Sequence, residues 1–138
     1  MLDNTIIMGV NAPKPHQRAI GKLMTALGHL FYREGKIPYE PFTETMIDEG
    51  KTSPTPDVLL FDNRTGSNKV IIEVSTSAGE RKDFEKLVEL MRDYDVQEGF
   101  VYNYNNNTWR KYRLDAGEVK DAPSFCETIG YDLKEFLQ

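Results

Sequence analysis

Two short apolar runs with one polar segment between them constrain the fold of this chain more than any other feature. Residues 58–61 follow the pair Pro56-Asp57, residues 70–74 contain Glu73, and residues 63–68 between the runs are polar. Short runs rich in Val, Ile and Leu that are bounded by turn residues predict buried strands. If the two strands pair as a hairpin, the carboxylates of Asp57 and Glu73 converge. Strand alternation places Glu73 on the same face as Ser75.

The remaining pattern predicts a mixed α/β domain. A helix is expected from Pro13 or Pro15 to a stop at Gly35, because its apolar residues recur at helical spacing. Residues 37–47 contain two prolines and favour an edge strand. A second helix is predicted across residues 84–94, and an aromatic-rich hairpin over residues 99–104 and 108–114 turns at an Asn run. We expect one domain over residues 1–138, in which helices cover a central mixed sheet.

Composition narrows the class of protein. The chain has 138 residues, a formal net charge of -5 and one cysteine, Cys126. These values disfavour a basic nucleic-acid coat protein, an internal disulfide framework and a cysteine-rich zinc site. Its apolar runs are far shorter than the ~20 residues of a membrane span. The first residues lack the basic region and apolar core of a secretory signal, so we expect a cytoplasmic protein without a membrane segment.

Asp57 and Glu73 are the residues most indicative of chemistry. A carboxylate in a buried strand is costly unless it is paired or bound to a metal. Two convergent carboxylates suit Mg²⁺, which keeps several water ligands and can promote hydrolysis of a phosphodiester. Each acid alone also has a structural interpretation: Asp57 as a turn cap and Glu73 as one half of an ion pair.

The order of these residues resembles the PD-(D/E)XK nuclease superfamily, through Pro56-Asp57 and Ile72-Glu73-Val74-Ser75. More narrowly, the chain resembles a restriction endonuclease family that is abundant in cyanobacteria. The segments that carry the narrower resemblance are Pro15-His16-Gln17-Arg18, Tyr39-Glu40-Pro41, the helix with Asp83 and Lys86, residues 98–102 and residues 109–113. The resemblance implies a restriction endonuclease-like fold. It also implies Asp57 and Glu73 as Mg²⁺ ligands in the hydrolysis of DNA.

One position departs from the superfamily. The usual lysine two residues after the second acid is replaced by Ser75, which cannot supply a cation. In the narrower family a lysine of the following helix fills this role, and Lys86 matches it best, with Lys82 as the second choice. Pairing of Lys86 with Glu89 or Asp83 on the helix surface is the alternative interpretation.

Further candidates follow from the same resemblance and from residue type. Glu40 is a possible third metal ligand, or else an edge-strand charge that discourages aggregation. His16 and Gln17 begin the first helix, whose positive end suits phosphate, or else His16 is a plain surface residue near the first turn. Arg110 lies in an aromatic-rich strand and is a candidate contact to the DNA backbone, or else a charge on the exposed side of a half-buried strand. Arg18 and Lys82 are further candidate contacts to nucleic acid.

We therefore expect a Mg²⁺-dependent endonuclease that uses Asp57, Glu73 and Lys86 and that acts on DNA as a homodimer. A catalytically inactive module of the same fold, which binds a protein or nucleic-acid partner, is the alternative. Ser75 and the acidic net charge favour that alternative. A hydrolase of small phosphoesters is a third possibility.

Overall fold

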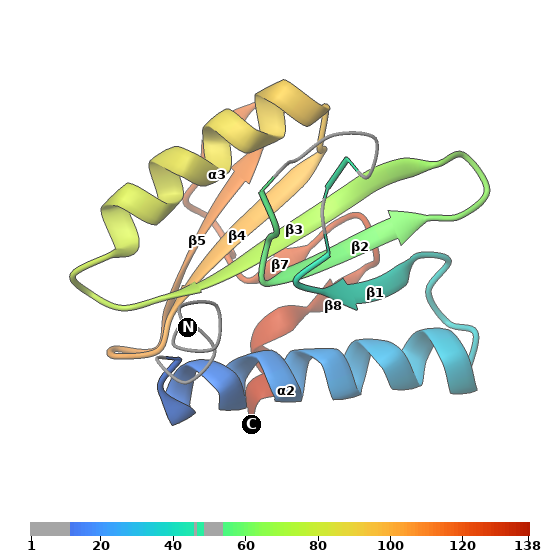
Figure 1. Cartoon of the computed structure of the whole chain (residues 1–138), viewed down its shortest axis with the longest axis horizontal. Helices are drawn as coiled ribbons and strands as arrows, with labels where there is room; N and C mark the ends of the chain where they lie inside the picture. Colours follow the sequence, from blue (N-terminus) through green and yellow to red (C-terminus); the bar gives the residue numbers. More distant parts are fainter. Residues whose placement is uncertain (1–11, 46, 49–53) are drawn as a thin grey trace, which may run out of the picture.

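The chain forms a six-stranded sheet with a long helix on each face (Figure 1). The computed structural model describes residues 12–45, 47–48 and 54–138. The helical elements are α2 (Lys14–Gly28), the π-helical turn η1 (His29–Arg33), α3 (Glu80–Tyr94) and the 3₁₀ turn η2 (Leu133–Leu137). The strands are β1 (Glu40–Thr43), β2 (Val58–Asp62), β3 (Ser67–Ser75), β4 (Glu98–Asn103), β5 (Thr108–Arg113), β6 (Gly117–Val119), β7 (Phe125–Cys126) and β8 (Tyr131–Asp132).

The strand order follows the chain from β1 to β6, and among the described strands only β3 and β4 pair in parallel. Helix α3 connects these two strands, as a parallel connection requires. The β2–β3 hairpin has Val58 opposite Ile72, whereas the β3–β4 pairing continues to Ser75 opposite Asn103. The last residues of β3 therefore extend beyond the start of β2.

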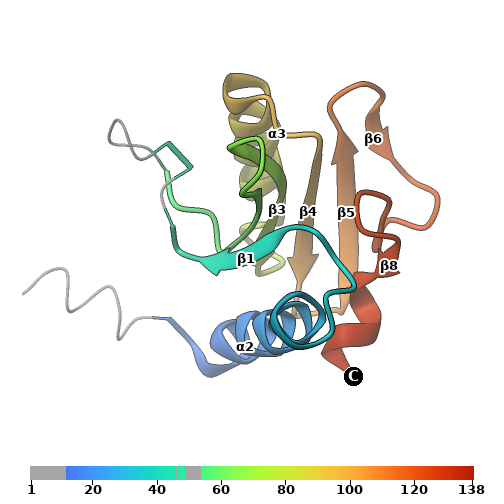
Figure 2. The same ribbon diagram turned by 90° about the vertical axis from the view of Figure 1, so that its right-hand side faces the viewer.

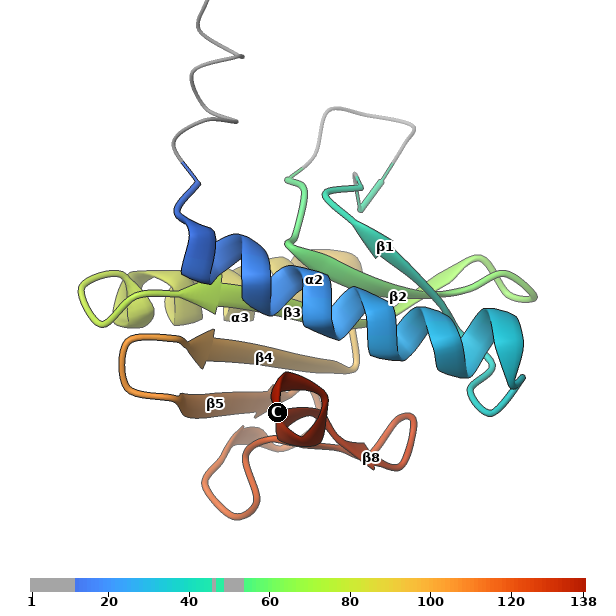
Figure 3. The same ribbon diagram turned by 90° about the horizontal axis from the view of Figure 1, so that it is seen from below.

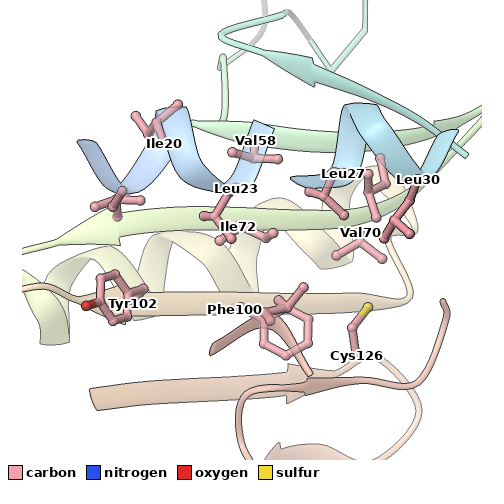
Figure 4. Close-up of a cluster of buried hydrophobic side chains, with 14 of the residues drawn as sticks. Ile20, Leu23, Leu27, Leu30, Val58, Val70, Ile72, Phe100, Tyr102 and Cys126 are labelled. Atoms are coloured by element: carbon pink, nitrogen blue, oxygen red, sulfur yellow. The ribbon is translucent and has the colours of Figure 1, made fainter. Parts of the chain in front are cut away.

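Helices α2 and α3 cover opposite faces of the sheet, and each buries its own apolar cluster (Figure 2). Helix α2 runs across β2 and β3, and the C-terminal elements lie beside it (Figure 3). Its cluster joins side chains of the helix to alternate residues of β2, β3 and β4: Ile20, Leu23, Leu27, Val58, Val70, Ile72 and Phe100 (Figure 4). The cluster under α3 contains the strand residues that alternate with these, Leu59, Ile71 and Val101. They pack against Phe84, Leu87 and Met91 of the helix. The alternation predicted for the strands is therefore observed.

The predicted α/β architecture is confirmed, with small differences at the ends of elements. The first helix ends in a π-helical turn before Gly35, which has φ 61°. The edge strand is limited to Glu40–Thr43. The Asn turn is observed between β4 and β5, where Asn107 has φ 58°. Strands β6, β7 and β8 were not predicted, because two or three residues carry too little alternation to identify a strand. No helix among the described residues is long and apolar enough to cross a membrane.

Candidate active site at the end of the parallel strands

The side chains of Asp57 and Glu73 accept hydrogen bonds from backbone N–H groups at the junction of β2 and β3. The Asp57 carboxylate accepts a hydrogen bond of 2.7 Å from the backbone N–H of Val74. The Glu73 carboxylate accepts one of 3.1 Å from the backbone N–H of Asp57. These two bonds bring together acids that are 16 residues apart in the sequence.

The strand register explains why the two acids meet. Strand β2 begins at Val58, so the edge of β3 beyond Ile72 has no strand partner on that side. Asp57, immediately before β2, supplies the missing acceptor through its side chain. The main chain around it is held by Thr43, whose hydroxyl donates to the Asp57 carbonyl at 2.8 Å. The Asp57 side chain therefore continues the hydrogen bonding between β2 and β3 beyond the first residue of β2.

The environment of Glu73 favours its protonated form. Burial, the negative charge of Asp57 and that of Asp83 together raise the pKa of Glu73 to about 8, although the N–H of Asp57 opposes the shift. Burial and neighbouring like charges both disfavour a carboxylate, and such perturbed acids are concentrated at functional sites. A cation beside these acids would remove the unfavourable repulsion.

His16 approaches the same acids from the other helix. Its Nε2 atom lies 3.5 Å from Oδ2 of Asp57, and the two side chains are 21% and 19% exposed. The second ring nitrogen, Nδ1, is buried and has no hydrogen-bond partner among the residues that the structure describes. The ring packs edge-on against Tyr104, with 6.4 Å between the centroids. Figure 1 shows why these groups meet: α2 and α3 both begin at the end of the sheet where β4 turns into β5.

Ser75, the residue at the usual lysine position, bonds to helix α3. Its hydroxyl donates a hydrogen bond of 2.6 Å to Oδ2 of Asp83, in the first turn of the helix. Its neighbour in β4, the buried Asn103, donates to the side chain of Glu80 at 2.8 Å. The carboxyl ends of β3 and β4 and the start of α3 therefore share one polar network. In α/β sheets this is a common location for ligand sites.

Lys86 lies one helical turn beyond Asp83 and lines a cavity with Glu73. The cavity has a volume of about 390 Å³ and is also bordered by Glu89, Asp93 and Tyr94. The Lys86 side chain is exposed, and within the described part of the chain the structure shows no ion pair for it. The alternative interpretation, an ion pair of Lys86 with Glu89 or Asp83, is not observed among the described residues, and Asp83 instead accepts from Ser75.

The other predicted residues are placed away from the two acids or are already paired. Glu40 pairs in register with Phe61, at the far end of β2 from Asp57, and its carboxylate accepts from Tyr32 at 2.5 Å and from Asn63 at 2.9 Å. The structure thus separates Glu40 from the two acids. Arg18 and Lys82 are exposed on α2 and α3.

Arg110 is engaged within the protein. Its guanidinium forms two bonds to Glu118, of 3.1 and 2.9 Å, and stacks over the ring of Phe84 at 3.9 Å from the centroid. A bidentate ion pair combined with ring stacking holds the guanidinium firmly. Contact between Arg110 and DNA would require this arrangement to open.

The described residues contain no group of three or more His, Cys, Asp or Glu side chains that could hold a metal. A tetrahedral zinc site needs three or four protein ligands, so the arrangement does not fit zinc. Mg²⁺ is commonly held by one or two carboxylates, with water or substrate oxygens completing its shell. Asp57 and Glu73 fit that simpler requirement.

The sequence predicts Asp57, Glu73 and Lys86 as site residues, and the structure places Asp57 and Glu73 together and Lys86 beside the same cavity as Glu73. The hydrogen bond between Ser75 and Asp83 was not predicted. Asp83 was recognised only as part of the helix and as a possible partner of Lys86. A hydrogen bond between a strand end and the next helix depends on the approach of the two elements, which periodicity does not report. The one sequence signal was Gly79, in the connection between Ser75 and Asp83.

Comparison with known proteins supports the fold. No protein-family model and no curated protein matches the chain. Among solved structures, the chain resembles a protein from Anabaena variabilis of the DUF820 family that is described as a candidate nuclease. The match has a TM-score of 0.66 and 15% identity, and it covers 91% of this chain and 83% of that one. It also resembles the type IIG restriction endonuclease BpuSI, with a TM-score of 0.54 and 13% identity over 88% of this chain and 15% of that enzyme. The chain therefore has an α/β fold of the restriction endonuclease-like kind.

Proposed function

We propose that this protein is a metal-dependent endonuclease that hydrolyses phosphodiester bonds in DNA. The observation that carries the proposal is the placement of Asp57 and Glu73 side by side: Glu73 accepts from the Asp57 N–H, and Asp57 accepts from the N–H of Val74. Burial and the neighbouring Asp57 raise the pKa of Glu73, and acids perturbed in this way are concentrated at functional sites. The fold shared with nucleases supports the same conclusion.

Asp57 and Glu73 are the proposed ligands, and Mg²⁺ is the proposed ion. When bound, the ion would lower the pKa of water and offset charge on the phosphate. The chain contributes two hard oxygen ligands whose carboxylates are oriented by hydrogen bonds from the backbone N–H groups of Val74 and Asp57. With only two protein ligands, phosphate oxygens of the substrate can enter the remaining positions.

Two cationic or potentially cationic side chains flank the acids. Lys86 borders the cavity beside Glu73, where its amine can orient the attacking water and offset phosphate charge. His16 lies on the Asp57 side, at the first turn of α2, where it can contact a phosphate oxygen. The two side chains therefore approach the acids from opposite faces of the sheet. One chain offers one such site, so cleavage of both DNA strands predicts a homodimer.

The first prediction tests the proposed ligands. Asp57→Asn and Glu73→Gln should each reduce Mg²⁺-dependent cleavage of plasmid and single-stranded DNA by at least about a hundredfold, because each removes a negatively charged ligand. Gel assays with and without EDTA measure the effect. Glu85→Gln, on the exposed side of α3, is the matched control and should cleave normally. Equal cleavage by all four proteins would point to a contaminating nuclease and contradict the proposal.

A second function is favoured by Ser75 and Asp83. Here Ser75, bonded to Asp83, stands at the position where the superfamily has a lysine, and loss of that lysine is the change expected of a binding module that has lost catalysis. Calorimetric titration with Mg²⁺ and with Mn²⁺ separates the two functions. Binding that is lost in Asp57→Asn supports the nuclease. Failure of both ions to bind, together with inactive wild-type protein, favours the module.

A further inference from the structure

We propose that the hydrogen bond between Ser75 and Asp83 fixes helix α3 on the sheet so that Lys86 faces Glu73. Ser75 and Asp83 are then positioning residues, and the strand lysine of related nucleases is replaced by a helix lysine together with the bond that places it. This inference rests on the proposed nuclease function and names a further element of the same site.

On the strand side of this contact, Ser75 is buried and hydrogen-bonded. Ser75 is the last residue of β3 and lies on the same face as Glu73, two positions away. Its side chain is buried, and its hydroxyl donates to Asp83 at 2.6 Å. A short bond to a carboxylate in a buried position is stronger than an ordinary surface hydrogen bond. The bond therefore ties the start of the helix to the strand that carries a proposed metal ligand.

On the helix side, the position of Asp83 determines that of Lys86. Residues three apart lie on the same side of an α-helix, so fixing Asp83 sets the direction of Lys86. Lys86 and Glu73 border the same cavity of about 390 Å³. The buried side chains of Phe84 and Leu87, next to Asp83 and Lys86 in the sequence, pack this part of the helix against the sheet.

Two glycines allow the close approach that the contact needs. A Cβ atom at Gly79 would lie 3.3 Å from the Ser75 hydroxyl and 3.4 Å from Oδ2 of Asp83, closer than most real contacts. On the sheet, a Cβ atom at Gly99 would lie 2.5 Å from the sulfur of Met91. The helix backbone thus packs tightly at both points, which fixes the position of the helix from which Lys86 projects.

The same geometry explains why position 75 is not a lysine. The Asp83 carboxylate occupies the space next to the Ser75 side chain, where a longer side chain would meet the helix. A small residue is required there if α3 is to pack as it does. The cation therefore reaches Glu73 from the helix and not from the strand.

A double-mutant cycle tests the proposal. Ser75→Ala should lower kcat for DNA cleavage by about ten- to a hundredfold with little change in KM, because a displaced amine weakens transition-state contacts. Lys86→Ala should lower kcat by about a hundredfold. The double variant should be no slower than Lys86→Ala alone, since both changes act through the same amine. Effects that multiply, or a Ser75→Ala enzyme as fast as wild type, would overturn the proposal.

A matched control excludes a purely structural effect. Ser124 also donates to a carboxylate, Asp132, at 2.7 Å, but in the β7–β8 pair. Ser124→Ala should lose a similar amount of thermal stability and keep full kcat. If Ser75→Ala fails to fold, Asp83→Asn, which keeps an acceptor oxygen, should retain more activity than Asp83→Ala. Equal activity of the two Asp83 variants would contradict the positioning role.

The outcome also separates this inference from the proposed function. If Asp57→Asn is inactive while the Ser75 and Asp83 variants behave as wild type, only the positioning role fails. If wild-type protein shows no cleavage that depends on Asp57, the nuclease proposal fails first.

Discussion

At the scale of single residues, Glu73 shows how this site stores an unfavourable interaction. It lies within an otherwise apolar run of β3, residues 70–74, and alternation directs it to the face that α3 covers. The N–H of Asp57 satisfies one carboxylate oxygen, but the neighbouring acids raise the pKa of Glu73 to about 8. The protonated acid is therefore the stable form of the folded protein near neutral pH when no cation is bound.

The pH dependence of stability should reveal this proton. In the unfolded chain Glu73 titrates near 4.5, and in the folded protein near 8, so the folded state binds the proton more tightly. The stabilisation from this proton is complete below the unfolded value and is lost as the pH rises from about 4.5 to about 8. Glu73→Gln keeps a neutral side chain throughout. The free energy of unfolding of Glu73→Gln, measured in urea, should therefore exceed that of wild type by an amount that grows across this pH window, to on the order of 2–4 kcal/mol.

Mg²⁺ provides the control for that measurement. A bound cation favours the ionised acid, so saturating Mg²⁺ should stabilise wild type above pH 6 and reduce the advantage of Glu73→Gln. Binding at neutral pH should also release a proton, which calorimetry in buffers of different ionisation enthalpy detects. A stability difference that is the same at every pH would show that Glu73 has an ordinary pKa.

At the scale of elements, a second buried acid has a structural role at the other end of β4. Glu98, fully buried, accepts from the backbone of Glu127 at 2.8 Å and from the hydroxyl of Thr128 at 2.6 Å, and it pairs with Lys111 of β5 at 2.9 Å. Burial alone would raise the pKa of Glu98, but the bonds from Thr128, Lys111 and the backbone lower it below its usual value. This acid fastens the C-terminal segment to the sheet.

Removal of the cation in this pair should be strongly destabilising. Lys111→Met leaves Glu98 buried and without its main counter-charge, so we expect a loss of about 3–5 kcal/mol in the free energy of unfolding. Urea unfolding measures the change. Lys120→Met is the control. Lys120 is 85% exposed, and its pairing with Glu118 at 3.6 Å is a weak surface ion pair. The substitution should therefore lower the free energy of unfolding by less than about 0.5 kcal/mol. A Lys111→Met protein as stable as wild type would mean that hydrogen bonds alone suffice for Glu98.

The elements themselves were largely predictable, because period and turn chemistry are local. The β2–β3 hairpin, the Asn turn and both long helices follow from apolar spacing and from residues such as Pro13, Gly35 and Asn107. The parallel pairing of β3 with β4 and the short strands β6 to β8 depend on contacts between distant segments, which no local pattern reports.

For the candidate site, too, the local features could be predicted and the contacts between distant segments could not. Asp57 directly precedes an apolar strand and Glu73 lies within one, so residue type and spacing predict that the two acids lie close together, as the structure shows. Glu40 was grouped with them by resemblance, but β1 runs antiparallel to β2 and begins at the far end of it. The Ser75–Asp83 bond was not foreseen, since it depends on how closely α3 approaches the sheet at Gly79.

At the scale of the whole molecule, the two ends of the sheet have different roles. One end gathers Asp57, Glu73, Ser75 and Asp83 around the carboxyl ends of the parallel strands, and the other holds the Glu98 network. The acidic end matters for DNA because the chain as a whole also carries a net charge of -5. Repulsion between this protein and phosphate is therefore the default, and a divalent cation is the means to reverse it.

DNA binding should consequently depend on the cation before any cleavage occurs. With the Lys86→Ala variant, which should bind without efficient cutting, fluorescence anisotropy of a labelled duplex should show binding in Mg²⁺ and at least about tenfold weaker binding in EDTA. The dependence of affinity on salt should be shallow, because few basic side chains replace counterions on the DNA. Asp57→Asn in the same background should bind equally in Mg²⁺ and EDTA, since it lacks a proposed ligand. Tight binding in EDTA with a steep salt dependence would instead locate the contact on basic residues such as Arg18 and Lys22 of α2, and the acidic end of the sheet would then have no part in holding DNA.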